Sequence, residues 1–196
     1  MPILLRWDIN IWWKKAAEEN DIVHLFVVSE DASLVPFAVR KKLVQEGVAH
    51  LPNAVVHESG PYIISNATFP SYFLKDEETV IEGHARLDLA VFFQIARELQ
   101  ICRRYVGEEP FSQVTGIYNR IMKEELKKKD IDCIVVPRKE KEGTIISAST
   151  VRQYIKNMQW EDLKKIVPDT TWNYFTSAEA QKIIAAIQNS DNVIHY

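Results

Sequence analysis

The chain has 196 residues, which is enough for one domain with a substantial core. With 46% hydrophobic and 26% charged residues, its composition is that of an ordinary globular protein. A net charge of −3 argues against a general nucleic-acid binder, and no apolar run is long enough to span a membrane.

The two cysteines, Cys102 and Cys133, lie far apart and have no Cys-x-x-Cys spacing and no neighbouring histidine. We therefore expect buried, reduced thiols rather than a disulfide or a metal site. No signal peptide is visible, so we expect the protein in the cytoplasm.

Apolar runs alternate with amphipathic periods along the chain. Near-continuous apolar runs predict buried strands at residues 22–29, 53–57 with 62–64, 101–106 and 131–136. Helical periods predict helices at residues 36–47, 85–99, 111–128, 151–158, 161–166 and 178–188. This alternation implies an α/β fold with a parallel sheet and helices on both faces, and the last helices form a C-terminal helical appendage.

Parallel sheets bind ligands at the carboxyl ends of their strands. Three polar stretches directly follow predicted strands and should share this rim: Ser29 with Asp31, then Gly107 with Glu108 and Glu109, and finally residues 137–149. The polar segment 69–79, with its acidic run, is expected to be a functional loop.

Residues 145–152 read Ile-Ile-Ser-Ala-Ser-Thr-Val-Arg between the last strand and a helix. The first-turn amides of a helix lack intrahelical partners, and its dipole is positive there. Ser147 and Ser149 are placed to cap those amides or to share them with a phosphate, and Arg152 adds a charged fork one turn later. The alternative interpretation is an ordinary Ser/Thr cap followed by a surface arginine.

Four stretches, at residues 25–32, 67–76, 105–119 and 137–152, resemble the C-terminal domain of citrate lyase ligase. The motif Ile-Ser-x-Ser/Thr-x-x-Arg marks the wider nucleotidyltransferase superfamily, whereas Phe-Pro-Ser-Tyr-Phe-Leu-Lys-Asp is far more particular. The resemblance implies a Rossmann-like nucleotidyltransferase fold. It also implies the reaction of ATP, with Mg²⁺, acetate and the citrate lyase thiol to give AMP, pyrophosphate and an acetyl thioester. That thiol belongs to the prosthetic group of the acyl-carrier (gamma) subunit.

Adenylation needs groups that position the reactants and stabilise charge on the phosphates. On this resemblance the triphosphate would be held by Ser147, Ser149, Thr150 and Arg152, and the leaving pyrophosphate by Arg138 and Lys139. Glu108 and Glu109 are candidates for holding Mg²⁺ indirectly, because this ion keeps several waters. Lys75 and Asp76 are candidates for contact with acetate or the carrier, whereas Arg86 and Asp88 are expected only to tie their helix to the rim. A solvated basic loop and a simple acidic pair remain the alternatives for the 138–139 and 108–109 pairs.

Two departures from the family pattern matter. The family carries an additional N-terminal acetyltransferase-like domain, which this sequence does not include. Its first ATP motif, Asn-Pro-Phe-Thr-x-Gly-His, should precede Lys15 but is missing, so no catalytic residue is assigned. The strand before that motif, central in this fold, is missing or substituted, which would expose strand edges.

We hypothesise that residues 1–15 are the product of a shifted reading frame; the alternative is a genuinely divergent N-terminus. Read one base out of frame, the Trp7/Asp8 junction encodes Gly and the Asp8/Ile9 junction only His or Tyr. The shifted frame can spell Ala-Asn-Pro-Phe-Thr-Leu-Gly-His-Gln-Tyr-Leu-Val-Glu-Lys and run into Ala16. We therefore divide the chain into an out-of-frame or divergent segment, 1–15, and a family domain, 16–196, and expect the true chain to extend upstream.

Two other functions remain open at this point. One is a different adenylyltransferase of the superfamily, such as one acting on phosphopantetheine. The other is a non-catalytic remnant that binds nucleotide or the lyase complex. Because the strand before the motif and the Gly-His motif itself are missing, we predict that the chain as written is poorly stable and nearly inactive, respectively.

Overall fold

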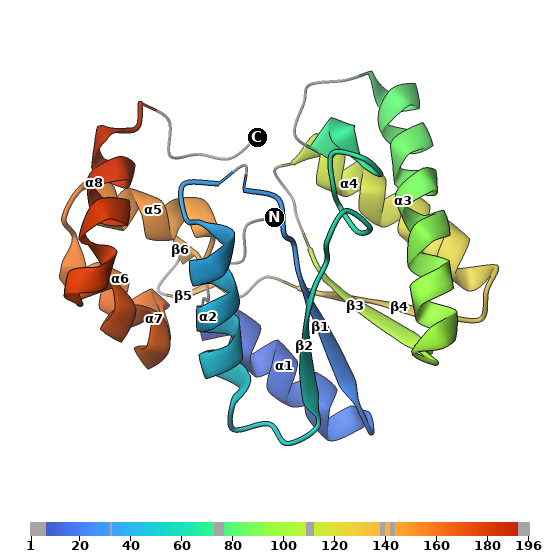
Figure 1. Ribbon diagram of the computed structural model, residues 1–196, viewed down its shortest axis with the longest axis horizontal. Coiled ribbons are helices and arrows are strands. Elements are labelled where there is room, and N and C mark those ends of the chain that lie inside the picture. The colour runs from blue at the N-terminus through green and yellow to red at the C-terminus, as the bar shows by residue number, and fades with distance from the viewer. Residues whose placement is uncertain are drawn as a thin grey trace. The chain divides into compact units, whose positions relative to one another are not determined.

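The computed structural model describes residues 7–31, 33–72, 77–108, 112–137, 140–141 and 144–191. Its elements fall into two units, which are described separately (Figure 1). The first unit is formed by the described parts of residues 1–27, 31–58 and 139–195. The second unit is formed by residues 28–30 and the described parts of 59–138.

The first unit contains a pair of parallel strands, β1 (Val23–Val27) and β2 (Ala54–Glu58). Their register aligns the first residue of one strand with the first residue of the other. Helices α1 (Trp7–Glu19) and α2 (Phe37–Val48) contact this pair. Pro36, with a φ of −57°, stands directly before α2, where its fixed φ favours the start of a helix. The sequence prediction of these two strands and of α2 is confirmed to within two residues at each end.

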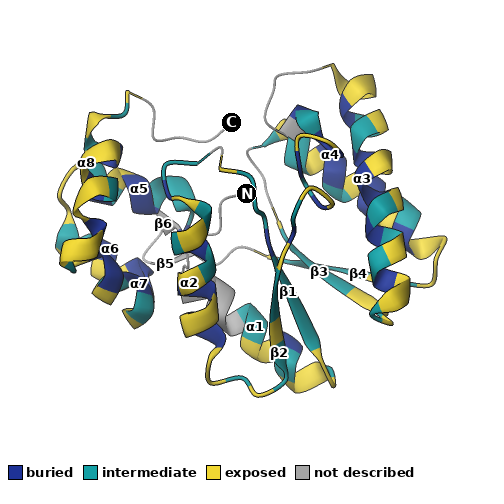
Figure 2. Cartoon of the chain, viewed as in Figure 1, coloured by how far each residue is buried: buried dark blue, intermediate teal, exposed yellow. Residues whose placement is uncertain are grey.

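The helices that close the chain belong to the core of the first unit. They are α5 (Ala148–Lys156), α6 (Trp160–Ile166), α7 (Asp169–Phe175), the 3₁₀ turn η2 (Ala178–Ala180) and α8 (Gln181–Asn189). One hydrophobic cluster joins Leu43 of α2 to Val151, Leu163, Phe175 and Ile187 of these helices. Lys42 adds an ion pair of 2.9 Å to Glu179. The prediction of a C-terminal appendage is therefore corrected, because these helices bury their apolar faces against α2 (Figure 2).

The second unit contains the parallel strands β3 (Arg103–Gly107) and β4 (Asp132–Val136), with helices α3 (Glu78–Glu98) and α4 (Gln113–Lys127). A 3₁₀ turn, η1 (Pro70–Tyr72), contacts both helices. The two helices bury residues such as Ile81, Leu89 and Phe92 from α3 and Ile121 and Met122 from α4. On their exposed side, Arg120 of α4 pairs with Glu78 and Glu82 of α3, at 2.9 and 2.6 Å.

Both helices of the second unit end in the same way. Gln100 and Asp130 adopt left-handed backbone conformations, with φ of 54° and 55°. The next residue in each case, Ile101 or Ile131, donates its N–H to the carbonyl of Ala96 or Leu126, five residues earlier. This pattern is a Schellman motif, which glycine usually completes. It turns each helix directly into the following strand.

The structure corrects several sequence predictions. Residues 62–64 form no strand, because Gly60 and Pro61 break the run and the N–H of Ile64 bonds to Asp88 instead. Strand β4 is followed by a short antiparallel pair, β5 (Glu140–Lys141) and β6 (Thr144–Ile145), and α7 was not foreseen. Both cysteines are free, as expected, but Cys102 is exposed and not buried.

The parallel pairing is confirmed, whereas a single continuous sheet is not. Among the described residues β1 pairs only with β2, and β3 only with β4. Within the same described residues, no helix combines the length and apolar character needed to cross a bilayer.

Candidate functional site

The best-formed polar cluster lies at the start of α5 in the first unit. Ser147 caps the helix, and its hydroxyl accepts the N–H of Thr150 at 3.0 Å. The same hydroxyl lies 2.7 Å from the hydroxyl of Ser149 and 2.8 Å from that of Thr150. Three hydroxyls therefore gather at the positive end of a helix dipole, an arrangement suited to anions.

Arg152 lies one turn into the same helix and is only 2% exposed. Burial away from water lowers the pKa of its guanidinium from the ordinary 12.5 to about 10. The group therefore stays charged at neutral pH, although burial disfavours its charge. The alternative interpretation of a surface arginine is wrong, while the cap assigned to Ser147 is confirmed. Along the helix, residue 152 follows the hydroxyl cluster by about one turn.

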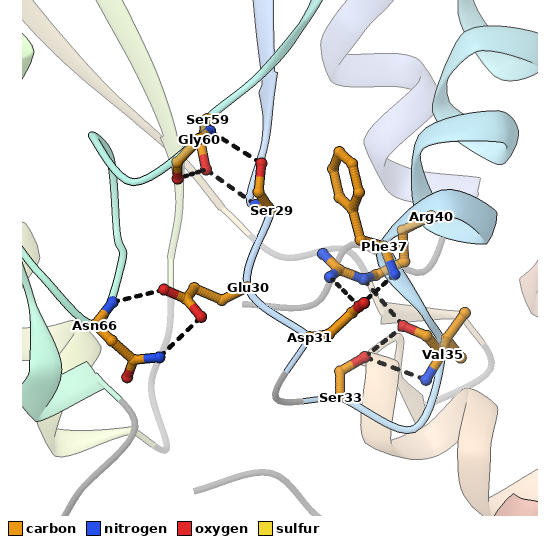
Figure 3. Close-up of polar contacts among 10 residues, drawn as sticks. All are labelled: Ser29, Glu30, Asp31, Ser33, Val35, Phe37, Arg40, Ser59, Gly60 and Asn66. Atoms are coloured by element: carbon orange, nitrogen blue, oxygen red, sulfur yellow. Dashed lines mark hydrogen bonds and ion pairs between the residues drawn. The ribbon is translucent and has the colours of Figure 1, made fainter.

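Asp31, which follows β1, organises the start of α2 in the first unit (Figure 3). Its carboxylate accepts the backbone N–H of Phe37 and lies 3.4 Å from Nη2 of Arg40. Arg40 is 1% exposed and also donates from Nε to the carbonyl of Val35 at 3.1 Å. Burial lowers the pKa of Arg40, and the charge of Asp31 opposes this shift. Asp31 therefore has a structural role here.

Ser29 lies in the second unit and fastens the segment after β1 to the segment after β2 (Figure 3). Its N–H donates to the hydroxyl of Ser59 at 3.0 Å, and its own hydroxyl accepts the N–H of Gly60 at 2.9 Å. Next to it, the carboxylate of Glu30 accepts both the backbone and the side-chain N–H of Asn66, at 2.8 Å each. Both of these hydrogen bonds of Ser29 therefore serve to hold the two segments together.

Asp88 is fully buried in α3 and accepts three hydrogen bonds. They come from the N–H of Ile64 at 2.5 Å, the hydroxyl of Thr68 at 2.8 Å and the hydroxyl of Tyr118 at 2.6 Å. Asp88 therefore ties α3 to α4 and to the 61–69 loop. Arg86 also ties α3 to α4, because it pairs with Glu125 and lies 3.8 Å from Glu124. The sequence analysis expected these two residues to tie their helix to the rim, whereas the contacts described here run to α4 and to the 61–69 loop.

Gly107 ends β3, and its carbonyl accepts the side-chain amide of Asn119 at 3.3 Å. Glu108 is exposed, and its N–H extends the strand pairing to the carbonyl of Val136 at 2.9 Å. No cluster of three or more metal-binding side chains occurs among the residues that the structure describes. Five predicted residues lie outside the described part of the chain: Lys75, Asp76, Glu109, Arg138 and Lys139.

The structure thus brings Ser147, Ser149, Thr150 and Arg152 together on one short helix. Sequence reasoning missed the Arg104–Tyr118–Asp88 chain in the second unit, where Arg104 donates to the Tyr118 hydroxyl at 3.1 Å. The signal that could have identified Arg104 is a charged residue within a predicted buried strand. It also missed the contact of the buried Ser71 hydroxyl with His84 Nδ1, at 2.5 Å.

Comparison with known proteins gives the family. A family model described as the citrate lyase ligase C-terminal domain matches residues 11–175. Citrate (pro-3S)-lyase ligase of Haemophilus influenzae is 41% identical over 167 residues, which cover 82% of this chain and 50% of that protein. The Klebsiella pneumoniae enzyme of the same name is 37% identical over 174 residues, covering 86% and 50%. The Escherichia coli enzyme is 36% identical over 167 residues, covering 82% and 47%.

The chain spans about half the length of the curated relatives it matches. The matched region contains the hydroxyl cluster and Arg152, as well as the residues of the Asp88 network. The chain belongs to the citrate lyase ligase family and carries the C-terminal domain of that family.

Proposed function

We propose that this domain binds ATP at the start of α5 and uses it to activate acetate for transfer to the citrate lyase acyl carrier. The observation that carries the proposal is the hydroxyl cluster of Ser147, Ser149 and Thr150 one turn from the buried Arg152. Family membership supplies the reaction, because the curated relatives are named citrate (pro-3S)-lyase ligases.

The physical case for a phosphate at this position rests on charge. The first-turn N–H groups of α5 and the three hydroxyls are hydrogen-bond donors at a positive helix end. A bound phosphate would replace the hydroxyl-to-hydroxyl contacts of Ser147 with charge-assisted hydrogen bonds, which are stronger. It would also offset the burial that disfavours the charged form of Arg152, and so raise the pKa of that guanidinium again.

In the proposed reaction a carboxylate oxygen of acetate attacks the α-phosphorus of ATP, and pyrophosphate leaves. The acyl-carrier thiolate then attacks the carbonyl carbon of acetyl-adenylate, the acyl–oxygen bond breaks and AMP leaves. The groups at the start of α5 would orient the triphosphate and neutralise charge as the phosphoryl bonds change. Arg138 and Lys139, which precede β5 in the sequence, remain candidates for binding the pyrophosphate.

Magnesium would enter this reaction with ATP. Mg²⁺ binds a few carboxylates together with substrate phosphates and waters, so it needs no cage of protein ligands. Glu108 and the next residue in the sequence, Glu109, remain the candidate carboxylates for this ion. When bound with ATP, Mg²⁺ would supply neutralisation of phosphate charge.

The test is release of AMP from ATP in the presence of acetate and deacetylated citrate lyase. AMP should appear only when all three substrates are present, and isothermal titration calorimetry should detect ATP binding that Arg152→Gln weakens at least tenfold. Pyrophosphate release with phosphopantetheine but not with acetate would identify another adenylyltransferase. ATP binding without any turnover, even at high enzyme concentration, would leave only a nucleotide-binding remnant.

A further inference from the structure

Two N–H donors of Asn66 hold the carboxylate of Glu30 within the second unit (Figure 3). The backbone N–H of Asn66 donates to Oε1 of Glu30, and the side-chain amide donates to Oε2, at 2.8 Å each. We call this pair of donors the Asn66 fork. Because one donor meets each oxygen, its geometry matches a carboxylate in the two-point manner that gives specificity for this group.

The turn that carries the Asn66 fork is fixed from inside the protein. On one side, the fully buried Ser65 accepts the N–H of Thr68 at 3.1 Å, and Thr68 donates from its own hydroxyl to Asp88 at 2.8 Å. On the other side, Ile64 takes a left-handed φ of 49°, which is unfavourable for a β-branched residue, while Asp88 accepts its N–H at 2.5 Å. The fork is therefore preorganised, so a carboxylate binds without first ordering the turn.

The Asn66 fork is open to exchange with a dissolved carboxylate. Asn66 is exposed and Glu30 is only partly buried, so water reaches the contact between them. A hydrogen bond in such a place contributes little net stability, because each group can bond to water instead. In the sequence Glu30 closely follows β1, and the turn follows β2. The carboxyl ends of parallel strands are where such sheets bind their ligands.

We propose that Asn66 binds the carboxylate of acetate and that Glu30 occupies the Asn66 fork when acetate is absent. This inference rests on the proposed function, in which acetate is the carboxylate substrate. The fork carries no positive charge, so it orients the carboxylate without neutralising the nucleophile. Each carboxylate oxygen has about two lone-pair sites, so an oxygen that accepts one N–H keeps a lone pair for attack on the α-phosphorus.

Competition from Glu30 makes an unusual prediction for its removal. Acetate has to displace Glu30, so its apparent Kd is the intrinsic Kd divided by the fraction of chains in which the Asn66 fork is free. Two hydrogen bonds without an ion pair should give a weak complex, with an apparent Kd of about 1 to 10 mM. In Glu30→Ala the fork is always free, so acetate should bind about fivefold more tightly or better.

Acetate titration of the whole chain, followed by proton–nitrogen NMR of the backbone and side-chain N–H signals of Asn66, tests the proposal. Sodium chloride at equal ionic strength is the reference. Asn66→Ala, followed through the backbone N–H at position 66, keeps only that donor and should weaken acetate binding about tenfold. Glu30→Gln keeps the size of the side chain but only one acceptor oxygen, so its acetate affinity should lie between those of wild type and Glu30→Ala.

Glu179→Ala is the matched control, because it removes an equally charged, exposed carboxylate that pairs with Lys42 at 2.9 Å in the first unit. It should leave acetate binding unchanged, and circular dichroism verifies that each variant folds. Signals of Asn66 that do not move in about 100 mM acetate, at least ten times the expected Kd, overturn the proposal. So does a Glu30→Ala chain that binds acetate no more tightly than wild type, because the contact would then only fasten two segments together.

The titration contains no ATP, which separates this inference from the proposed function. AMP release that depends on acetate, without acetate binding at Asn66, would refute this inference alone. Acetate binding at Asn66 without any AMP release would refute the proposed function and leave the carboxylate site in place. Where AMP is released, the KM for acetate should fall in Glu30→Ala and rise in Asn66→Ala.

Discussion

The hydroxyl of Tyr118 donates a hydrogen bond to the buried carboxylate of Asp88, with 2.6 Å between the two oxygens. The same hydroxyl accepts a hydrogen bond from Nη2 of Arg104 at 3.1 Å. The guanidinium carbon of Arg104 lies 4.1 Å from the ring centroid of Phe92, a cation–π distance. Tyr118, on α4, thus connects a partly buried cation on β3 with a buried anion on α3.

Replacement of Tyr118 by phenylalanine should lower the free energy of unfolding by about 1 to 3 kcal/mol, because Asp88 and Arg104 each lose a buried partner. Urea denaturation measures the change. Tyr154→Phe is the matched control: Tyr154 is partly buried, and its hydroxyl makes no hydrogen bond within the described part of the chain. Equal stability losses in the two variants would contradict the role given to the Tyr118 hydroxyl.

The same residue predicts a dependence on alkaline pH. Burial, with the charge of Asp88 beside it, raises the pKa of Tyr118 above its ordinary value of 10. Above that pH the unfolded chain loses the phenolic proton while the folded chain keeps it, so stability falls as pH rises. The stability difference between wild type and Tyr118→Phe should therefore narrow above about pH 10, by up to about 1.4 kcal/mol per pH unit.

Urea titrations at pH 9, 10 and 11 measure this narrowing. The lowered pKa of Arg152 makes the free energy of unfolding rise with pH in this range, because the unfolded chain then binds one proton more than the folded chain. This contribution is the same in wild type and in Tyr118→Phe, so it cancels in their difference. A difference that stays constant across the three pH values would show that Tyr118 titrates normally in the fold.

Local sequence patterns predicted the elements that depend on local chemistry. The strand runs and the Ser147 cap were found because an apolar run and a serine before a helix act within a few residues. Contacts far apart in the sequence could not be read in this way. Ile64 leaves the strand conformation because Asp88, 24 residues later, takes its N–H. Arg152 is buried in a core that α6 to α8 help to build, and nothing near Arg152 indicates that burial.

The helix ends at Gln100 and Asp130 offer a stabilising change. Both residues hold left-handed backbone angles, which glycine adopts without steric cost. Gln100→Gly and Asp130→Gly should each raise the free energy of unfolding by about 0.5 to 1 kcal/mol. Lys123→Gly, on the exposed side of α4, is the control and should lower it by about 1 kcal/mol. The same urea measurement compares all three, and a loss of stability at both helix ends would refute the prediction.

Three serine variants should separate capping from ATP binding. Ser147→Ala removes the cap of α5 and should cost about 1 kcal/mol of stability and weaken ATP binding. Ser149→Ala, which removes no cap, should weaken ATP binding several-fold with stability nearly unchanged. Ser112→Ala removes the cap of α4, where the Ser112 hydroxyl accepts the N–H of Thr115 at 3.3 Å, and should cost stability alone.

Calorimetric titration with ATP and thermal unfolding with and without ATP give both quantities for each serine variant. A ligand that binds only the folded chain stabilises it by RT ln(1 + [L]/Kd), so at a fixed ATP concentration tighter binding gives a larger rise in the unfolding temperature. ATP should therefore shift the unfolding temperature of Ser112→Ala as much as that of wild type, and that of Ser149→Ala less. An unchanged ATP affinity in Ser149→Ala would remove this hydroxyl from the proposed site.

The last prediction concerns the missing Gly-His motif. The family resemblance implies that the histidine of this motif stabilises the transition-state phosphate, and loss of one such donor would cost about a hundredfold or more in rate. Replacement of residues 1–15 by Ala-Asn-Pro-Phe-Thr-Leu-Gly-His-Gln-Tyr-Leu-Val-Glu-Lys should raise ATP-, acetate- and lyase-dependent AMP release at least about a hundredfold. The same segment with alanine in place of its histidine is the control: it should keep the stability of the restored chain and lose the rate. The prediction is wrong if the unaltered chain melts cooperatively and already forms acetyl-adenylate at the rate of the restored chain. The frame-shift hypothesis is wrong if the shifted frame of the coding DNA does not read through to Gly-His.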